Sequence, residues 1–224
     1  MKKFLLMNMP STIGVYKGKD SALKGIIAPR PMVSMAELAG SVLAAGADCK
    51  ILELQISEKP FEEIEITIKS YQPDYVGLTF TTLLFEEAKA VAKFIRQKFP
   101  KVIIVAGGVH PTIFPEEVAA VPDIDLVVYG EGDITLQEIL KDNFYKNIKG
   151  LVFKHNGKII KNPARPGVEN LDTLPLPAWH LFDSKIYMNP KAIARESPVG
   201  TISTSRGCVY NCTYCNKSVF GKRF

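Results

Sequence analysis

The amino-acid sequence predicts a doubly wound α/β domain built around a parallel sheet of five strands. From residue 1 to residue 140, short apolar segments alternate with amphipathic segments of helical period, the order expected of successive βαβ units. The apolar run from Val102 to Val105 contains only β-branched residues, as expected for a parallel strand covered on both faces. Hydrophobic residues make up 46% and charged residues 23% of the 224-residue chain, which excludes a mainly disordered or coiled-coil protein.

Each predicted strand is a short apolar run, and most end at a turn signal. The first strand ends before Asn8 and Pro10, and the fourth ends before Gly107 and Gly108. The fifth runs into a Gly-Glu-Gly-Asp segment, residues 130–133. The five strands are expected at residues 4–7, 51–56, 75–80, 102–105 and 126–129.

The predicted helices begin and end at cap and breaker residues. Ser34 is the expected N-cap of the first helix, and Glu37 completes a capping box with it. Gly46 ends this helix, and Pro100 ends the third. The helices are expected at residues 34–46, 61–68, 86–99, a short one from 115, and 135–140. Five strands, each followed by a helix, favour a Rossmann-like sheet with the flavodoxin-like strand order.

The pattern changes after residue 145. Residues 151–160 are predicted to form a β-hairpin around the turn Asn156-Gly157. Four prolines between residues 162 and 180 indicate an extended linker, and Gly200 to Ser205 is expected to be a new strand. The predicted organisation is therefore a first domain at 1–145, a hairpin and linker at 146–198, and the start of a truncated second domain at 199–224.

Charge and hydropathy exclude several kinds of partner. The net charge is only +5, and no basic cluster is interleaved with aromatic residues, so no nucleic-acid partner is expected. No run approaches the ~18 apolar residues that a membrane-spanning helix requires. The N-terminal apolar stretch ends at Asn8, too early for the core of a signal peptide. We therefore expect a cytoplasmic protein.

Three of the four cysteines, Cys208, Cys212 and Cys215, have the spacing C-x-x-x-C-x-x-C. Three thiolates on one tight loop can hold three corners of a 4Fe-4S cluster and leave the fourth iron open. A structural zinc site usually has four protein ligands in paired C-x-x-C form, so zinc is the less favoured alternative. Cys49, which lies near the second strand, is interpreted as a small buried apolar residue.

A second candidate site lies at the carboxyl ends of the predicted parallel strands, where open α/β sheets bind their ligands. These ends are rich in glycine and hydroxyl groups. Gly107 and Gly108 allow close approach of a flat or extended ligand, because no Cβ intervenes, although an ordinary strand-to-helix turn also uses glycine. Hydroxyl groups there can hydrogen-bond a buried nucleotide tail; they belong to Thr79, Thr81 and Thr82.

The segment from Thr201 to Cys215, with its Arg-Gly-Cys-x-x-x-Cys-x-x-Cys motif, resembles the start of a radical S-adenosylmethionine enzyme. The resemblance implies that the three cysteines bind a 4Fe-4S cluster whose open iron chelates S-adenosylmethionine. One-electron reduction then cleaves this cofactor to a 5′-deoxyadenosyl radical. The resemblance also implies that Tyr214 lies against the adenine of the cofactor.

The five-stranded domain before that motif is similar to the cobalamin-binding module of the class related to the anaerobic magnesium-protoporphyrin IX monomethyl ester oxidative cyclase. The resemblance implies a channel for the dimethylbenzimidazole tail, lined by the hydroxyl loop and the Gly107-Gly108 loop. Gly130, Glu131 and Gly132 resemble a loop that closes around the corrin, although such acidic turns are also common after strands. The full set of expected cobalamin contacts is Asn8, Pro10, Thr79, Thr81, Thr82, Gly107, Gly108, His110, Gly130, Glu131 and Gly132.

One motif of other cobalamin modules is missing. The D-x-H-x-x-G motif, whose histidine ligates cobalt, is absent between residues 9 and 33, where the nearest string has Ala22 in place of the histidine. Members of this class often bind cobalamin without a histidine ligand. His110 can approach the corrin, or it is simply a turn histidine between a strand and a proline.

The resemblance as a whole implies the N-terminal portion of a cobalamin-dependent enzyme that performs methyl transfer or oxidative cyclisation at an unactivated carbon. It implies a small-molecule substrate and an electron donor for the cluster, and it assigns no catalytic residue within this chain. We expect these 224 residues to bind cobalamin without forming 5′-deoxyadenosine. Two alternatives remain: a stand-alone corrinoid carrier with a cysteine tail, and a nucleotide- or flavin-binding protein with a zinc tail.

Overall fold

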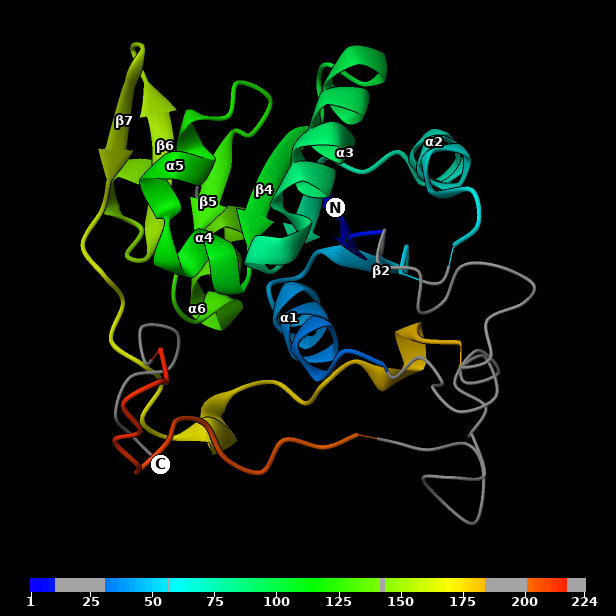
Figure 1. Cartoon of the computed structure of the whole chain (residues 1–224). Coiled ribbons are helices and arrows are strands. Elements are labelled where there is room, and N and C mark those ends of the chain that lie inside the picture. Colours follow the sequence, from blue (N-terminus) through cyan, green and yellow to red (C-terminus); the bar gives the residue numbers. More distant parts are fainter. Residues whose placement is uncertain (11–30, 56, 142–143, 184–200, 217–224) are drawn as a thin grey trace.

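In the computed structural model, which describes residues 1–10, 31–55, 57–141, 144–183 and 201–216, a seven-stranded sheet forms the centre of the molecule (Figure 1). The strand order is β2-β1-β3-β4-β5-β6-β7. Its first five strands are parallel, and their order is the flavodoxin-like order that the sequence predicted. The strands are β1 (Lys3–Asn8), β2 (Asp48–Leu52), β3 (Tyr75–Thr79), β4 (Ile103–Gly107), β5 (Leu126–Val128), β6 (Leu151–His155) and β7 (Lys158–Lys161).

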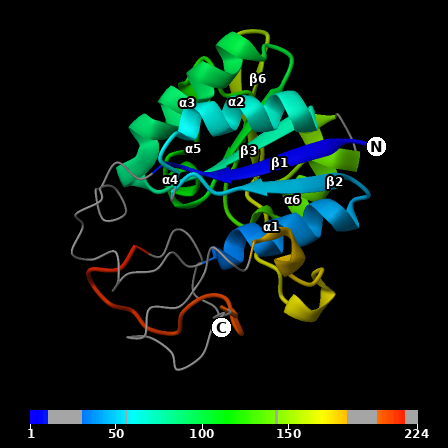
Figure 2. The ribbon, with the colours of Figure 1, turned by 90° about the vertical axis from the view of Figure 1, so that its right-hand side faces the viewer.

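Helices cover both faces of the sheet (Figure 2). The apolar side chains of α1 and α6 pack with those of one face, and the side chains of α2, α3 and α5 pack with the other. Each face of the central strands is therefore buried, which explains the continuous apolar runs in the sequence. The helices are α1 (Val33–Ala44), α2 (Pro60–Tyr71), α3 (Phe85–Lys98), α4 (Val109–Ile113), α5 (Pro115–Ala120) and α6 (Gly132–Lys141).

Several element ends differ from the prediction, and β2, α6 and α1 are three examples. Strand β2 occupies 48–52 instead of 51–56, since its pairing with β1 runs from Lys3↔Asp48 to Met7↔Leu52. Helix α6 begins at Gly132 instead of 135. Ser34 is not the N-cap of α1: the N-cap is Met32, without a side-chain capping bond, and Ser34 lies inside the helix.

The predicted hairpin is present and continues the same sheet. Strand β6 pairs antiparallel with β5, and β7 pairs antiparallel with β6. Asn156 and Gly157 have φ values of 50° and 75°, as the predicted Asn-Gly turn requires. The boundary predicted at residue 145 therefore falls within one continuous sheet.

The segment after the hairpin lies on α1. The Ala178 N–H donates to the Ala36 carbonyl at 2.8 Å. Gly40 permits this contact, because a Cβ at that position would collide with the Leu176 backbone oxygen. The first part of the predicted linker is thus attached to the sheet domain by its own backbone.

The strand expected at 200–205 is not formed over its described residues, 201–205. A strand needs the backbone groups of a neighbour, and within the described ranges no strand pairs with this segment. The string around Ala22 and the whole segment 184–200 lie outside the described residues. Across those same ranges, none of the helices has the length and apolar character needed to cross a bilayer.

Candidate functional site

A cavity of about 700 Å³ opens at the carboxyl ends of β1, β3, β4 and β5, on the face that α1 and α6 cover. This volume lies within the ordinary range of cofactor sites. Its inner wall is apolar and includes Phe4, Leu6, Val105 and Leu136, whereas hydroxyl, amide and carboxyl groups surround its mouth. The cavity is therefore suited to a ligand with an apolar body and a polar end.

The structure brings most of the predicted cobalamin contacts together around this cavity. Three of the predicted cobalamin contacts do not line it: Pro10, Thr82 and His110. Tyr214, which the resemblance assigns to S-adenosylmethionine, is 91% exposed, and its contact with that cofactor remains a prediction. The predicted residues that line the cavity are Asn8, Thr79, Thr81, Gly107, Gly108, Gly130, Glu131 and Gly132.

The two adjacent glycines after β4 have different roles. A Cβ at Gly107 would meet only the Val128 carbonyl oxygen, at 3.8 Å, so this glycine leaves free space beside the cavity. Gly108 has φ +103°, and a Cβ there would approach Thr79 Oγ1 at 2.8 Å. Gly107 thus makes room for a ligand, whereas Gly108 is required by the backbone itself.

Asn8, at the end of β1, has a structural function that the sequence did not show. Its Oδ1 accepts the N–H groups of Leu54 at 2.6 Å and Gln55 at 3.2 Å. These bonds hold the chain that leaves β2 against the end of β1. Asn8 therefore shapes one side of the cavity mouth, and its contact with a ligand remains a prediction.

Thr112 connects two of the loops and was not among the predicted contacts. Its hydroxyl donates to the Gly108 carbonyl at 2.7 Å and accepts the Gly130 N–H at 3.1 Å. It thereby joins the loop after β4 to the loop after β5. Thr112 lies one turn into the helical segment that follows the glycines, a position that could have identified it.

His110 is buried behind the mouth of the cavity, with 3% of its surface exposed. Its Nδ1 lies 3.2 Å from Thr82 Oγ1, and its ring is 4.3 Å from that of Phe85. Burial lowers the pKa of His110, which favours the neutral ring. The contact with Thr82 ties the hydroxyl loop to the α4 segment, so His110 braces two loops that frame the cavity.

A cluster of charged groups lies at the α1–α6 side of the mouth. The Arg206 guanidinium binds Asp133 in two places, through Nη1 at 2.8 Å and Nη2 at 3.2 Å. Nη2 also donates to Glu37 Oε2 at 2.9 Å, and Glu131 Oε2 lies 3.8 Å from Nη1. Burial raises the pKa of Glu37, and the nearby Arg206 opposes that rise. Glu37, Asp133 and Arg206 lie far apart in the sequence, and no sequence pattern groups them.

The three clustered cysteines are exposed on the segment that follows Arg206. The Cys215 N–H donates to the Cys212 carbonyl at 3.2 Å, which forms a tight turn between them. Among the described residues, no group of three or more His, Cys, Asp or Glu side chains is arranged to hold a metal. Cys49 is buried as predicted, at 4% exposure, and burial raises the pKa of its thiol to about 12.

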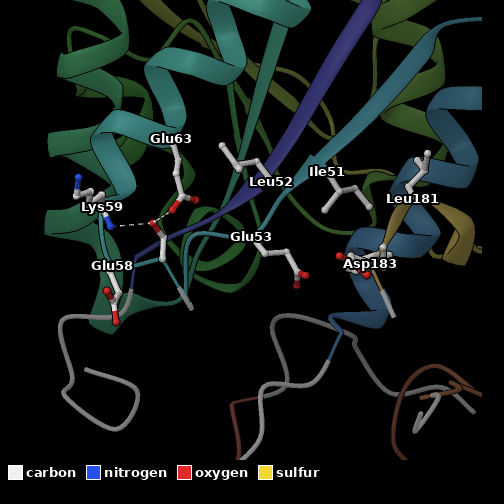
Figure 3. A pocket seen from close by; sticks show the side chains of 10 residues that line it. Ile51, Leu52, Glu53, Glu58, Lys59, Glu63, Leu181 and Asp183 are labelled. Atoms are coloured by element: carbon white, nitrogen blue, oxygen red, sulfur yellow. Dashed lines mark hydrogen bonds between the residues drawn. The ribbon is translucent and has the colours of Figure 1, made fainter. Parts of the chain in front are cut away.

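A second cavity lies where β2 ends, between α2 and the segment 181–183 (Figure 3). Ser57 donates to Glu63 at 2.7 Å and accepts the Lys59 N–H, and Figure 3 shows Glu53 apart from this group. Glu53 Oε1 is buried and has no hydrogen-bond partner in the described part of the chain. Burial raises the pKa of Glu53 to about 7.

Comparison with known proteins identifies the domain that carries the main cavity. A family model described as the B12 binding domain matches residues 31–140. Residues 31–140 are a B12-binding domain. The match excludes β1, yet β1 lies between β2 and β3 in the sheet and supplies Asn8 to the cavity.

The similarity to individual proteins covers more of the chain than the B12-binding domain alone. The chain is 37% identical over 225 residues to an uncharacterized methyltransferase of Pyrococcus horikoshii, covering 97% of this chain and 48% of the relative. It is 27% identical over 201 residues to the anaerobic magnesium-protoporphyrin IX monomethyl ester cyclase of Synechocystis, covering 87% of this chain and 39% of the relative. The chain therefore spans less than half the length of these relatives.

A solved structure shares the fold. The cobalamin-dependent S-adenosylmethionine radical enzyme OxsB, with aqua-cobalamin and S-adenosylmethionine bound, superposes with a TM-score of 0.71. The alignment covers 99% of this chain and 29% of that one, at 21% identity. The B12-binding domain is homologous to those of cobalamin-dependent radical S-adenosylmethionine enzymes and magnesium-protoporphyrin cyclase-like proteins, as the resemblance predicted.

The cavity fits the expected ligand of a B12-binding domain. Gly107 leaves space in which no side chain intrudes, and Gly130 has nothing within 4 Å of its missing Cβ. Thr79 and Thr81 present hydroxyl groups at the same mouth. An apolar interior with polar groups at its opening matches a benzimidazole nucleotide tail.

Proposed function

We propose that this chain is the cofactor-binding part of a cobalamin-dependent radical S-adenosylmethionine enzyme. One observation carries the proposal: the segment that contains Cys208, Cys212 and Cys215 is joined to the mouth of the B12-binding cavity through Arg206. Residues at that mouth would hold the corrin, and the cysteines that follow Arg206 in the chain would hold the cluster. The relatives named above support the enzyme class.

Within this proposal, the residues around the cavity hold cobalamin by its nucleotide tail. Gly107 admits the tail between the sheet and the helices, and the hydroxyl groups of Thr79 and Thr81 satisfy its polar atoms. Phe4, Leu6 and the other apolar wall residues exclude water from the interior. Gly130 and Gly132 let the loop after β5 lie close to the corrin.

The three loop cysteines have the donor chemistry of an iron–sulfur cluster with one open iron. Their exposure leaves them accessible to iron and sulfide, and bonds to the metal would themselves order the loop. The resemblance to radical S-adenosylmethionine enzymes supports a role for Tyr214, directly before Cys215, beside S-adenosylmethionine. When bound, the cluster and S-adenosylmethionine supply one-electron chemistry, and cobalamin supplies a methyl group or assists the radical step.

The proposed reaction is methyl transfer or oxidative cyclisation at an unactivated carbon of a small molecule. The names of the relatives, a methyltransferase and a cyclase, support these two outcomes equally. A reductant that delivers single electrons to the cluster is the expected protein partner. No residue of this chain is proposed to act on the substrate.

Anaerobic reconstitution tests the proposal. The chain is loaded with iron, sulfide and hydroxocobalamin, and the visible spectrum, iron and acid-labile sulfide are measured. We expect one cobalamin per chain, a base-off corrin spectrum, and about four irons per chain. Cys212→Ala should lose the iron and retain cobalamin, whereas Cys49→Ala, the control, should retain both.

Other outcomes would point elsewhere. Stoichiometric zinc in place of iron and sulfide would contradict the cluster. Failure to bind hydroxocobalamin, with binding of a flavin instead, would contradict the cofactor assignment as a whole.

A further inference from the structure

The side chain of Arg206 ties the segment 201–216 to α1 and α6. Most residues of this segment are exposed, yet the Arg206 side chain is only 12% exposed. Its guanidinium binds Asp133 in the two-pronged geometry that arginine forms with carboxylates. The same guanidinium reaches Glu37 on α1, so one side chain joins three parts of the molecule that are distant in sequence.

The carboxylates around Arg206 are also buried, which sets this cluster apart from ordinary surface ion pairs. The side chains of Asp133, Glu131 and Glu37 are 5%, 9% and 21% exposed. Ion pairs on the surface contribute little to the stability of a fold. Removing one partner of a buried pair is more costly, because it leaves a buried charge without a counter-charge. Burial lowers the pKa of Arg206, and the ion pairs with Asp133 and Glu37 more than restore it, so the guanidinium stays charged.

The position of the cluster connects the two candidate cofactor sites. Arg206, Glu37, Glu131 and Asp133 all line the B12-binding cavity, together with the neighbouring residues Ser203, Ser205 and Gly207. Cys208 follows Arg206 by two residues, which limits their Cα atoms to a separation of about 7 Å. The side chain that holds the chain two residues before the first cysteine therefore also forms part of the wall of the cobalamin cavity.

Helix geometry favours the arrangement. Asp133 lies in the first turn of α6, where the N-terminal end of the helix dipole stabilises a carboxylate. Glu37 lies on α1, the helix that packs beside α6 against the same face of the sheet. Without the guanidinium, the three carboxylates would face one another, and their mutual repulsion would open this side of the mouth.

We infer that Arg206 is a positioning residue that latches the cysteine segment to the mouth of the cobalamin cavity and thereby couples the two cofactor sites. The inference rests on the proposed function for the identity of the ligands, but the latch itself does not. By linkage, if the latch strengthens cobalamin binding, then cobalamin strengthens the latch by the same factor.

Trypsin cleavage measures how often Arg206 leaves its carboxylate partners, because trypsin can cleave after Arg206 only when that side chain is free to enter the protease. The rate of cleavage between residues 206 and 207 is measured by mass spectrometry under native conditions. Asp133→Asn should raise it by roughly tenfold, and Glu37→Gln, a milder change at a more exposed residue, by a smaller factor. Glu138→Gln is the matched control, because Glu138 lies on α6 and pairs with Arg165 instead.

The coupling is tested by adding hydroxocobalamin to the same proteins. In the unchanged chain, saturating hydroxocobalamin should slow this cleavage, and Arg206→Gln should weaken hydroxocobalamin binding by roughly five- to tenfold. Arg206→Lys should weaken it less, because it keeps the charge but loses the two-pronged bond. Thermal unfolding of each variant establishes that it is folded.

The outcomes separate the two proposals. Equal cleavage rates in Asp133→Asn, Glu138→Gln and the unchanged chain would overturn the latch, whether or not cobalamin binds. Faster cleavage in Asp133→Asn together with unaltered hydroxocobalamin affinity in Arg206→Gln would overturn the coupling. Absence of hydroxocobalamin binding to the unchanged chain would instead defeat the proposed function and leave the latch to be decided by the cleavage rates alone.

Discussion

The rim of the cobalamin cavity and the cysteine segment beside it differ in how firmly the rest of the protein holds their residues. At the rim, Asn8, Thr112 and Gly108 are held by hydrogen bonds or by a backbone conformation that few residues adopt. In the segment, all three cysteines are exposed and are not arranged around a common point. Packing alone can shape a site for a large organic cofactor, whereas a thiolate site takes its final shape from bonds to the metal.

The sharpest test of this comparison sets the buried thiol against the exposed ones. Cys49 should react with iodoacetamide roughly a thousandfold more slowly than the loop cysteines, because its thiol is buried and its pKa is raised to about 12. Pulse labelling followed by mass spectrometry measures each cysteine separately. Labelling of Cys49 at the rate of Cys208 would mean that the sheet domain is not closed around it.

The next largest effect concerns the open space at Gly107. Gly107→Leu should weaken hydroxocobalamin binding at least about a hundredfold, equivalent to about 2.7 kcal/mol, because the side chain would occupy the cavity. Spectroscopic titration measures the affinity. The amount of iron bound at the cysteines, measured without cobalamin, should remain unchanged, since the substitution does not touch the thiols or Arg206.

The neighbouring glycine supplies the control. Gly108→Ala should destabilise the fold by about 1–3 kcal/mol, because φ is +103° and the new Cβ would meet Thr79 Oγ1 at 2.8 Å. Denaturant unfolding should show this loss for Gly108→Ala and little change for Gly107→Ala. The reverse order would show that the roles of the two glycines have been assigned wrongly.

The smallest expected effect is the pH dependence at Glu53, which lies in the second cavity at the end of β2. Its folded-state pKa of about 7 lies above the unfolded value, so the protonated form contributes stability that is lost as pH rises through 7. Because solvent partly screens this group, we expect Glu53→Gln to gain only about 1 kcal/mol at about pH 8 and almost nothing near pH 4.5. Thermal unfolding of both proteins at the two pH values measures the difference; an equal gain at both would contradict the raised pKa.

Much of the sheet domain could be predicted from residues that are neighbours in the chain. Apolar runs gave the five parallel strands, and Asn156-Gly157 indicated the hairpin turn correctly. The predictions were wrong where contacts between distant residues set the end of a strand or helix. Pairing with β1 moved β2 toward the N-terminus, and Ser34 resembled an N-cap although α1 begins one residue before it.

The candidate site was predictable where glycines and hydroxyl groups follow strands, because parallel strands place their carboxyl ends along one edge. The charged cluster around Arg206 could not be predicted in this way. Glu37, interpreted as half of a capping box, binds Arg206 instead. Thr82 and His110, both assigned to the cofactor, contact each other behind the cavity.

What the sequence determined by itself were the periodicity of the elements, the turn at residues 156–157 and the three-cysteine spacing, since each depends on residues close together in the chain. Only the tertiary structure decided that Arg206 meets Asp133 and Glu37, which lie 73 and 169 residues away. Such pairings follow from how α1 and α6 pack on the sheet and from the burial of the charges between them, neither of which is visible in local patterns.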